Sequence, residues 1–151
     1  MGMMEKLQEM GLTLPEVATP VGAYVPAVRE GRLIFTSGQL PMVGGSLCYQ
    51  GKVGVDVTEE DAYQAARICA LNGLAAAANL AGGADKLLRV VKVTGFVNSS
   101  QDFTVHAKVL NGASEILGRI FTVGHARSAV GVASLPLNAV VEVEMILEVT
   151  E

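Results

Sequence analysis

Alternating apolar and polar residues predict β-strands in the second half of the chain, because alternation places successive side chains on opposite faces of a sheet. The stretches 87–98, 127–133 and 140–149 show this pattern. One face of the last stretch is entirely apolar: Val141, Val143, Met145, Leu147 and Val149. Glu142 and Glu144 are therefore expected to point away from the main core.

The second of these strands places Arg127 on one face together with the small residues Ala129 and Gly131. The connection 135–138, Leu-Pro-Leu-Asn, is short and has turn chemistry, which predicts that this strand and the last one are antiparallel neighbours. In the register that we assume, Arg127 and Glu142 lie on the same face, a few residues apart. A guanidinium and a carboxylate would then flank a patch floored by alanine and glycine, where a small anion could fit.

The first half of the chain predicts fewer regular elements. Residues 24–28 and 32–36 are expected to form a hairpin around a glycine with positive φ. Residues 5–10 form either a short helix or a mobile end. The glycine-rich segment 41–54 is predicted to be a loop with one weak strand at 47–49.

Two helices are predicted. The first begins at Thr58, whose hydroxyl can cap the backbone, and ends at Gly82. The second is expected over residues 102–121, with Gly112 weakening its middle. Apolar residues at helical spacing indicate that both helices bury one side.

The order of these elements predicts an α+β fold with one mostly antiparallel sheet and two helices on one face. The other face, with Glu142, Glu144 and Ile146, must then meet solvent or a second chain. Half of the residues are hydrophobic and the mean hydropathy is +0.42, so we favour the second chain. The 151 residues suit a single domain, 1–151, in which 1–18 form a peripheral N-terminal extension.

Composition excludes several classes of function. The net charge is -4 and the basic residues do not cluster, so nucleic acid is not expected as a partner. Two histidines without a close Cys or carboxylate pattern predict no metal site, and Cys48 and Cys69 are too few for a disulfide framework. No apolar run is long enough for a membrane span and no secretory signal precedes the domain, so we expect a cytoplasmic protein without membrane contact.

The candidate site has ordinary structural explanations as well. Arg127 and Glu142 could be an ion pair at a subunit interface. Tyr24 could be an aromatic residue that fills an interface, and Ser37 a strand-end hydroxyl that satisfies the backbone. Gly38 follows an apolar strand, where glycine lets a ligand or another backbone approach closely.

Five segments together carry a resemblance to a known family. They are 22–25 (Gly-Ala-Tyr-Val), 36–41 (Thr-Ser-Gly-Gln-Leu-Pro), 126–130 (Ala-Arg-Ser-Ala-Val), 135–136 (Leu-Pro) and 141–144 (Val-Glu-Val-Glu). In spacing and order, along nearly the whole chain from Tyr24 to Glu144, they resemble the Rid/YjgF family, also called the endoribonuclease L-PSP family. The arginine block is the most specific of them.

This resemblance implies a chorismate-mutase-like fold of the bacillus type, assembled as a homotrimer with clefts between subunits. It also implies hydrolysis of 2-imino acids to 2-keto acids and ammonia, without a cofactor. In such members the arginine matching Arg127 holds the substrate carboxylate. Residues matching Tyr24, Ser37 and Gly38 line the cleft, and the carboxylate matching Glu142 orients water.

The chain departs from the deaminase pattern at the floor of the pocket. It has Ala129 where a cysteine is usual and Gly131 where an acidic residue is common. His125, which shares a face with Arg127, is a possible compensating group. The segments 111–114 (Asn-Gly-Ala-Ser) and 124–127 (Gly-His-Ala-Arg) resemble the longer-chain branch of the family.

Three functions follow as hypotheses. The first is an imine deaminase that uses Arg127 and Glu142, with Tyr24, Ser37, Gly38 and Ala129 around the substrate. The second is a non-catalytic binder of small carboxylates such as 2-keto acids. The third, an endoribonuclease or translation inhibitor, is disfavoured by the acidic charge balance.

Overall fold

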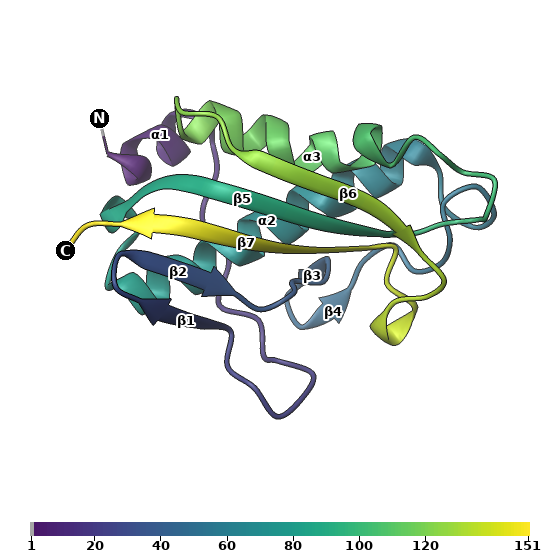
Figure 1. Cartoon of the computed structure of the whole chain (residues 1–151), viewed down its shortest axis with the longest axis horizontal. Coiled ribbons are helices and arrows are strands. Elements are labelled where there is room, and N and C mark those ends of the chain that lie inside the picture. Colours follow the sequence, from purple (N-terminus) through teal and green to yellow (C-terminus); the bar gives the residue numbers. More distant parts are fainter. Residues whose placement is uncertain (1) are drawn as a thin grey trace.

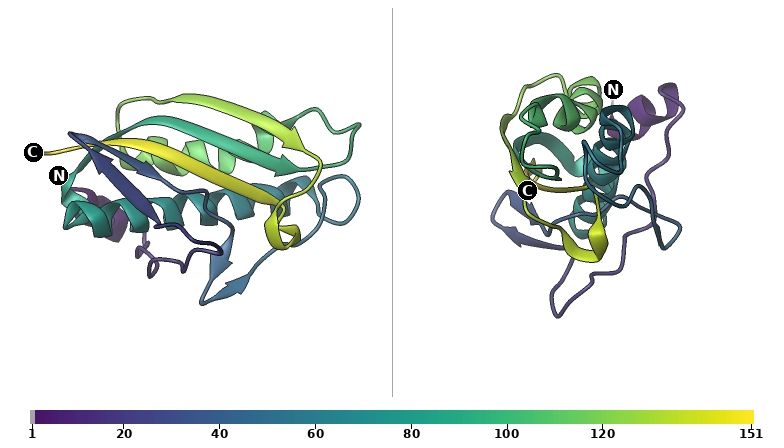
Figure 2. Two further views of the ribbon diagram at one scale, coloured as in Figure 1. Left: turned by 60° about the horizontal axis from the view of Figure 1, so that its bottom comes forward. Right: turned by 90° about the vertical axis from the view of Figure 1, so that its right-hand side faces the viewer.

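The computed structural model describes residues 2–151, and Met1 lies outside the described residues. A five-stranded sheet carries both long helices on one face, as Figures 1 and 2 show. The helices are α1 (Met3–Glu9), α2 (Glu59–Ala81) and α3 (His106–Ile120), with 3-10 turns η1 (Ala84–Lys86) and η2 (Pro136–Asn138). The strands are β1 (Ala27–Glu30), β2 (Leu33–Thr36), β3 (Met42–Val43), β4 (Ser46–Leu47), β5 (Leu87–Asn98), β6 (Ala126–Val132) and β7 (Val141–Val149). The predicted α+β class is confirmed.

The large sheet has the strand order β1-β2-β7-β5-β6. Strands β5 and β6 are parallel and α3 connects them, whereas the other neighbouring pairs are antiparallel. The prediction that β6 and β7 are antiparallel neighbours is therefore wrong, because β5 lies between them. A strand that follows a crossover helix usually lies parallel to the strand before that helix, and here this rule outweighs the short connection between β6 and β7.

The short connection passes across the end of β5. Leu137 and Asn138 both have positive φ, which turns the chain sharply. Asn98, the last residue of β5, donates hydrogen bonds to the Asn138 side-chain oxygen at 3.3 Å and to the Ala139 carbonyl at 3.1 Å. These contacts hold the crossing in place, so β7 enters the sheet on the far side of β5.

The observed register also corrects the predicted arrangement of the two charged candidates. Arg127 lies beside Val93 of β5, and Glu142 lies beside Phe96. Val93 is buried beneath the helices, and Phe96 belongs to the opposite face. Paired residues share a face of the sheet, so Arg127 faces the helices and Glu142 faces away from them. The prediction that they share one face is wrong.

Helix α2 is bounded as its sequence predicts. Thr58 Oγ1 accepts a hydrogen bond from the Asp61 backbone N–H at 3.1 Å and so caps the first turn. Gly82 ends the helix with φ +88°, a left-handed conformation that suits glycine. Alanine is frequent on its buried side, which allows close packing on β7 and on α3.

Helix α3 begins at His106, later than predicted, because Ser100 and Phe103 form a backbone turn after β5. Gly112 does not merely weaken this helix. A Cβ atom at Gly112 would collide with the backbone carbonyl oxygen of Tyr63 in α2, so glycine is what lets the two helices approach so closely.

The face of β7 that was predicted to be apolar is fully buried beneath the helices. The opposite face of the sheet carries apolar side chains that are exposed in the single chain, among them Val28, Phe35 and Val130. Ile146 lies between Phe35 and Lys92 on the same face. In Figure 2 this face has no helix over it.

The first hairpin is confirmed, with β1 and β2 joined around Gly31 at φ +61°, but β1 spans Ala27–Glu30 instead of the predicted 24–28. The segment 41–54 contains the two-stranded hairpin of β3 and β4 instead of one strand at 47–49. Near the N-terminus, Met3 and Leu7 of α1 are buried in the core. Within residues 2–151, no helix has both the length and the apolar character that crossing a bilayer requires.

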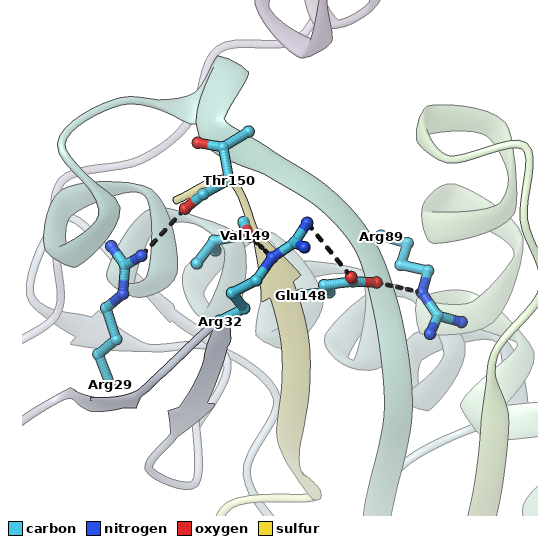
Figure 3. A network of polar contacts seen from close by, with 6 residues as sticks. All are labelled: Arg29, Arg32, Arg89, Glu148, Val149 and Thr150. Carbon is cyan, nitrogen blue, oxygen red and sulfur yellow. Dashed lines mark hydrogen bonds and ion pairs between the residues drawn. The ribbon is translucent and has the colours of Figure 1, made fainter.

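A polar network fixes the end of the sheet near the C-terminus (Figure 3). Glu148 contacts Arg89 at 2.7 Å and Arg32 at 3.6 Å. Arg29 donates a hydrogen bond to the Thr150 carbonyl at 2.9 Å. These side chains are largely exposed, so we assign the network a modest role in fixing β7 beside β2 and β5.

Candidate functional site

Arg127 extends from β6 along the surface of α3. Its Nη1 donates hydrogen bonds to Asn111 Oδ1 at 2.9 Å and to Ser114 Oγ at 3.1 Å. Its Nη2 lies 3.5 Å from the Ala107 carbonyl oxygen. Asn111 and Ser114 are three residues apart, so they share a face of the helix and reach the guanidinium together.

These contacts leave one edge of the guanidinium able to bind a ligand. Nη1 has two hydrogens, and Asn111 and Ser114 account for both. Within residues 2–151, Nε makes no hydrogen bond, and Nη2 makes only the long contact to Ala107. Nε and Nη2 form the parallel fork that matches the two oxygens of a carboxylate.

His125 is joined to the arginine through a shared hydroxyl. Its Nε2 lies 2.9 Å from Ser114 Oγ. Burial, and then the nearby charge of Arg127, lower the pKa of His125 and favour the neutral ring. Because arginine can only donate, Ser114 accepts from Arg127 and can give its own hydrogen to His125. His125 therefore supports Arg127 through Ser114.

A second cluster lies where β2 ends, beside β7. Ser37 Oγ donates a 2.6 Å hydrogen bond to the Val25 carbonyl, which ties the segment carrying Tyr24 to the end of β2. Tyr24, Ser37 and Gly38 line one shallow hollow. Ser37 thus satisfies a backbone carbonyl, which is the structural role considered for it above. The side chain of Tyr24 is about half exposed.

Gly38 and Glu142 are in close contact in this second cluster. A Cβ atom at Gly38 would lie 2.7 Å from Cδ of Glu142, so glycine is what makes space for the carboxylate. Burial, and then repulsion from Glu144, raise the pKa of Glu142. A carboxyl group with a raised pKa accepts a proton more readily than an ordinary carboxylate, as a general base must.

The structure therefore brings together Tyr24, Ser37, Gly38 and Glu142, but it separates them from Arg127. Strand β5 lies between the strands of Arg127 and Glu142, and the two side chains are on opposite faces. In the described part of the chain the Arg/Lys–carboxylate ion pairs involve Glu148, not Glu142. The predicted Arg127–Glu142 pair does not form within one chain.

Ala129 lies on the same side of β6 as Arg127 and packs against the core. It therefore contributes apolar surface, where a cysteine would contribute a thiol. Asn111 and Ser114 were not predicted as site residues. Their spacing on one helix face, opposite an arginine on the following strand, is the signal that could have identified them.

The sequence matches the family described as "YjgF/chorismate mutase-like, putative endoribonuclease" over residues 4–149. The chain belongs to the Rid/YjgF family. Its three helices within residues 2–151 and its mostly antiparallel sheet agree with the chorismate-mutase-like fold of that family.

Two Rid/YjgF relatives illustrate the range of names in the family. Protein TCP17 of Trypanosoma cruzi is 44% identical over 147 residues, with 94% of this chain and 91% of the relative covered. The 2-iminobutanoate/2-iminopropanoate deaminase of Dermatophagoides farinae is 32% identical over 137 residues, with 90% of this chain and 93% of the relative covered.

Solved structures give the same fold. The protein Atu1372 of Agrobacterium tumefaciens is 44% identical, with a TM-score of 0.88 and coverage of 98% of this chain and 92% of that one. TdcF of E. coli with bound serine is 26% identical, with a TM-score of 0.64 and coverage of 91% of this chain and 96% of that one.

Proposed function

We propose that the protein hydrolyses small 2-imino acids to 2-keto acids and ammonia in a cleft between two copies of the chain, within a homotrimer. Arg127 comes from one copy, and Tyr24, Gly38 and Glu142 come from the other. The observation that carries this proposal is the guanidinium of Arg127, which is held by α3 while its carboxylate-binding edge stays available.

Two properties of the sheet support the participation of a second copy. The face with Glu142 has exposed apolar side chains, including Phe35 and Val130, that a second chain would cover. Strand β6 is an edge strand, with hydrogen-bonding groups on its outer side that can meet another chain. Arg127 lies on that edge strand, so a neighbouring chain can bring its own Glu142 toward it.

The relatives support a small acid as the ligand. The relative from Dermatophagoides farinae is named as a deaminase of 2-imino acids. The E. coli neighbour TdcF carries bound serine, which has a carboxylate next to a nitrogen-bearing carbon. A 2-imino acid has the same arrangement, with a double bond to nitrogen.

The reaction needs few groups. The Nε and Nη2 edge of Arg127 holds the substrate carboxylate and so fixes the neighbouring imine carbon. Glu142 takes a proton from water as its oxygen bonds to that carbon, and the C=N bond becomes single. Glu142 then gives this proton to nitrogen, which forms a carbinolamine. Glu142 next takes the hydroxyl proton of the carbinolamine and transfers it to nitrogen, so that the C–N bond breaks, ammonia leaves and the C=O bond forms.

The test is semicarbazide trapping of 2-iminobutanoate, generated by an amino-acid oxidase. The wild-type protein should accelerate the loss of imine, and Arg127→Ala should not. Each cleft is expected to use two copies, so an equal mixture of the Arg127→Ala and Glu142→Gln variants should regain activity when it is unfolded and refolded together. The expected rate is about a quarter of the wild-type rate, because random assembly gives a quarter of the clefts both a native Arg127 and a native Glu142. Refolded wild type and each refolded single variant are the controls. A mixture that stays inactive, while refolded wild type is active, contradicts the two-copy site.

The second candidate is a non-catalytic binder of small carboxylates. It is favoured by Ala129 and Gly131, which leave the strand beside Arg127 without a thiol or an acid. Binding of 2-oxobutanoate that depends on Arg127 but not on Glu142, without acceleration of imine loss, would establish this function instead.

A further inference from the structure

A cavity of about 590 Å³ opens at the end of the parallel strands β5 and β6, where α3 begins. Lys52, Ser99 and His106 contribute polar groups, and Phe103 and Val132 contribute apolar surface. Volumes of a few hundred cubic ångströms are typical of small-molecule sites, as is an apolar lining with a few polar groups. The mechanism above uses none of these residues.

The cavity is distinct from the site of Arg127. Gly131, which lines it, lies four residues farther along β6, or about 13 Å at the usual rise of a strand. Arg127 lies beside Val93 in the middle of β5, whereas Gly131 lies beside Val97 near its end. Arg127 itself is not among the residues that line the cavity.

His106 sits directly over Gly131. A Cβ atom at Gly131 would lie 2.5 Å from Nε2 of His106, so the glycine is what allows the imidazole to occupy this position. The same nitrogen is 3.4 Å from Ser99 Oγ, a long contact, and the ring of Phe103 meets the imidazole edge to face at 5.3 Å. Gly131, a departure from the acidic residue common in the family, thus has a local structural reason.

Lys52 brings an uncompensated positive charge to the cavity. Its ammonium group donates to Asn98 Oδ1 at 2.7 Å and also to the Ala133 carbonyl, and both acceptors are neutral. An ammonium group has three hydrogens, so one remains for a ligand. No Asp or Glu lines the cavity among the described residues, although acidic residues outnumber basic ones in the chain.

We propose that this cavity is a second binding site, for a small carboxylate with an apolar or aromatic body. Lys52 supplies the counter-charge, His106 and Ser99 supply hydrogen-bonding groups, and Phe103 and Val132 contact the body of the ligand. Because Asn98 is fully buried and holds the ammonium group, the charge is preorganised, which favours binding.

The experiment is an amide NMR titration of the full-length protein with phenylacetate, and with phenylacetamide as its neutral counterpart. Phenylacetate should shift the signals of Gly131 and Ala133 with a single Kd, and phenylacetamide should bind at least about tenfold more weakly, because it lacks the charge. Equal binding of the two compounds, or shifts confined to Asn111 and Ser114, would overturn the proposal.

Three variants separate this site from that of Arg127. Lys52→Met should weaken phenylacetate binding about tenfold, since it removes the charged ammonium group and keeps most of the apolar side chain. If that variant does not fold, Gln101→Glu introduces a repelling charge at an exposed lining residue and should weaken binding severalfold. Arg127→Ala should leave the Kd measured at Gly131 unchanged. A Kd that rises in Arg127→Ala, or that stays constant in Gln101→Glu, would contradict a separate anion site.

Discussion

Replacing Gly38 with alanine tests the position of Glu142 by adding one methyl group. The added Cβ would lie 2.7 Å from Cδ and from Oε2 of Glu142, and 3.1 Å from Cγ. Ordinary van der Waals contact begins at 3.4 Å, so the carboxylate must move by somewhat under 1 Å. The φ of Gly38 lies outside the left-handed region, so alanine adds no backbone strain and the effect falls on Glu142.

The expected loss of activity is much larger than the loss of stability. Turning the glutamate side chain away from its preferred rotamer costs about 0.5–1.5 kcal/mol. Alanine in place of glycine returns about 0.4–1 kcal/mol by restricting the unfolded chain. A displacement near 1 Å at a reacting group can lower the rate on the order of 100-fold, which corresponds to about 2.7 kcal/mol in the activation free energy.

The assay is the rate of imine loss in the presence of semicarbazide, with kcat and KM measured separately. Gly38→Ala should lower kcat and leave KM nearly unchanged, because Arg127 still binds the carboxylate. Gly118→Ala is the matched control, since a Cβ at Gly118 meets no atom of residues 2–151 within 4 Å. If Gly38→Ala keeps more than half of the wild-type kcat while Glu142→Gln is inactive, the position of this carboxylate does not set the rate.

Three further predictions concern stability. Gly112→Ala should lower the free energy of unfolding by about 1–3 kcal/mol or more, because the new methyl group meets the Tyr63 carbonyl. Gly118→Ala on the same helix should instead raise the free energy of unfolding by about 0.5–1 kcal/mol. Urea denaturation of both variants measures this difference. The raised pKa of Glu142 means that the folded state binds more protons than the unfolded state. The contribution of Glu142 to stability is therefore present below its unfolded pKa and is lost as the pH rises through its folded pKa. Glu142→Gln should therefore remove that loss, which a series of Tm values against pH will detect, and an unchanged pH profile would contradict the assignment. The lowered pKa of His125 has the opposite effect, since the unfolded state binds more protons as the pH falls below about 6.5. The Tm of His125→Gln should therefore fall less in acid than that of the wild type in the same series.

The sequence predicted what depends on neighbours along the chain. The buried face of β7 and the outward direction of Glu142 follow from alternation alone, which is a local property. The Thr58 cap and the Gly82 helix end depend on a few adjacent residues and were also predicted. Strand pairing depends on distant segments, and the short 135–138 connection indicated the wrong partner for β6.

The better guide to pairing was the helix between β5 and β6. A strand, a helix and a second strand in succession favour a parallel pair, and α3 provides that helix. The hydrogen bonds from Asn98 to Asn138 and Ala139 then let a short connection cross the end of β5. The alternation pattern contains no signal for such contacts.

The candidate site shows the same limit. Ser37 and Gly38 are far from Glu142 in sequence, and only family resemblance grouped them before their contacts were known. That Arg127 would lie apart from them could not be predicted, because its face follows from pairing with β5. The roles of Asn111 and Ser114 required the position of α3 as well.

The separation of Arg127 from Glu142 has an electrostatic consequence that favours a second copy over an isolated chain. Within residues 2–151, neither residue has an oppositely charged partner, whereas Glu148 contacts both Arg32 and Arg89. Partial burial of an unpaired charge is unfavourable, and the raised pKa of Glu142 reflects that cost. An approaching guanidinium would lower the pKa of Glu142 again. A bound substrate carboxylate would neutralise that guanidinium, and the pKa of Glu142 would then rise. Ligand binding between two copies should therefore be accompanied by proton uptake near the pKa of Glu142, which calorimetry in buffers of different ionisation enthalpy can detect.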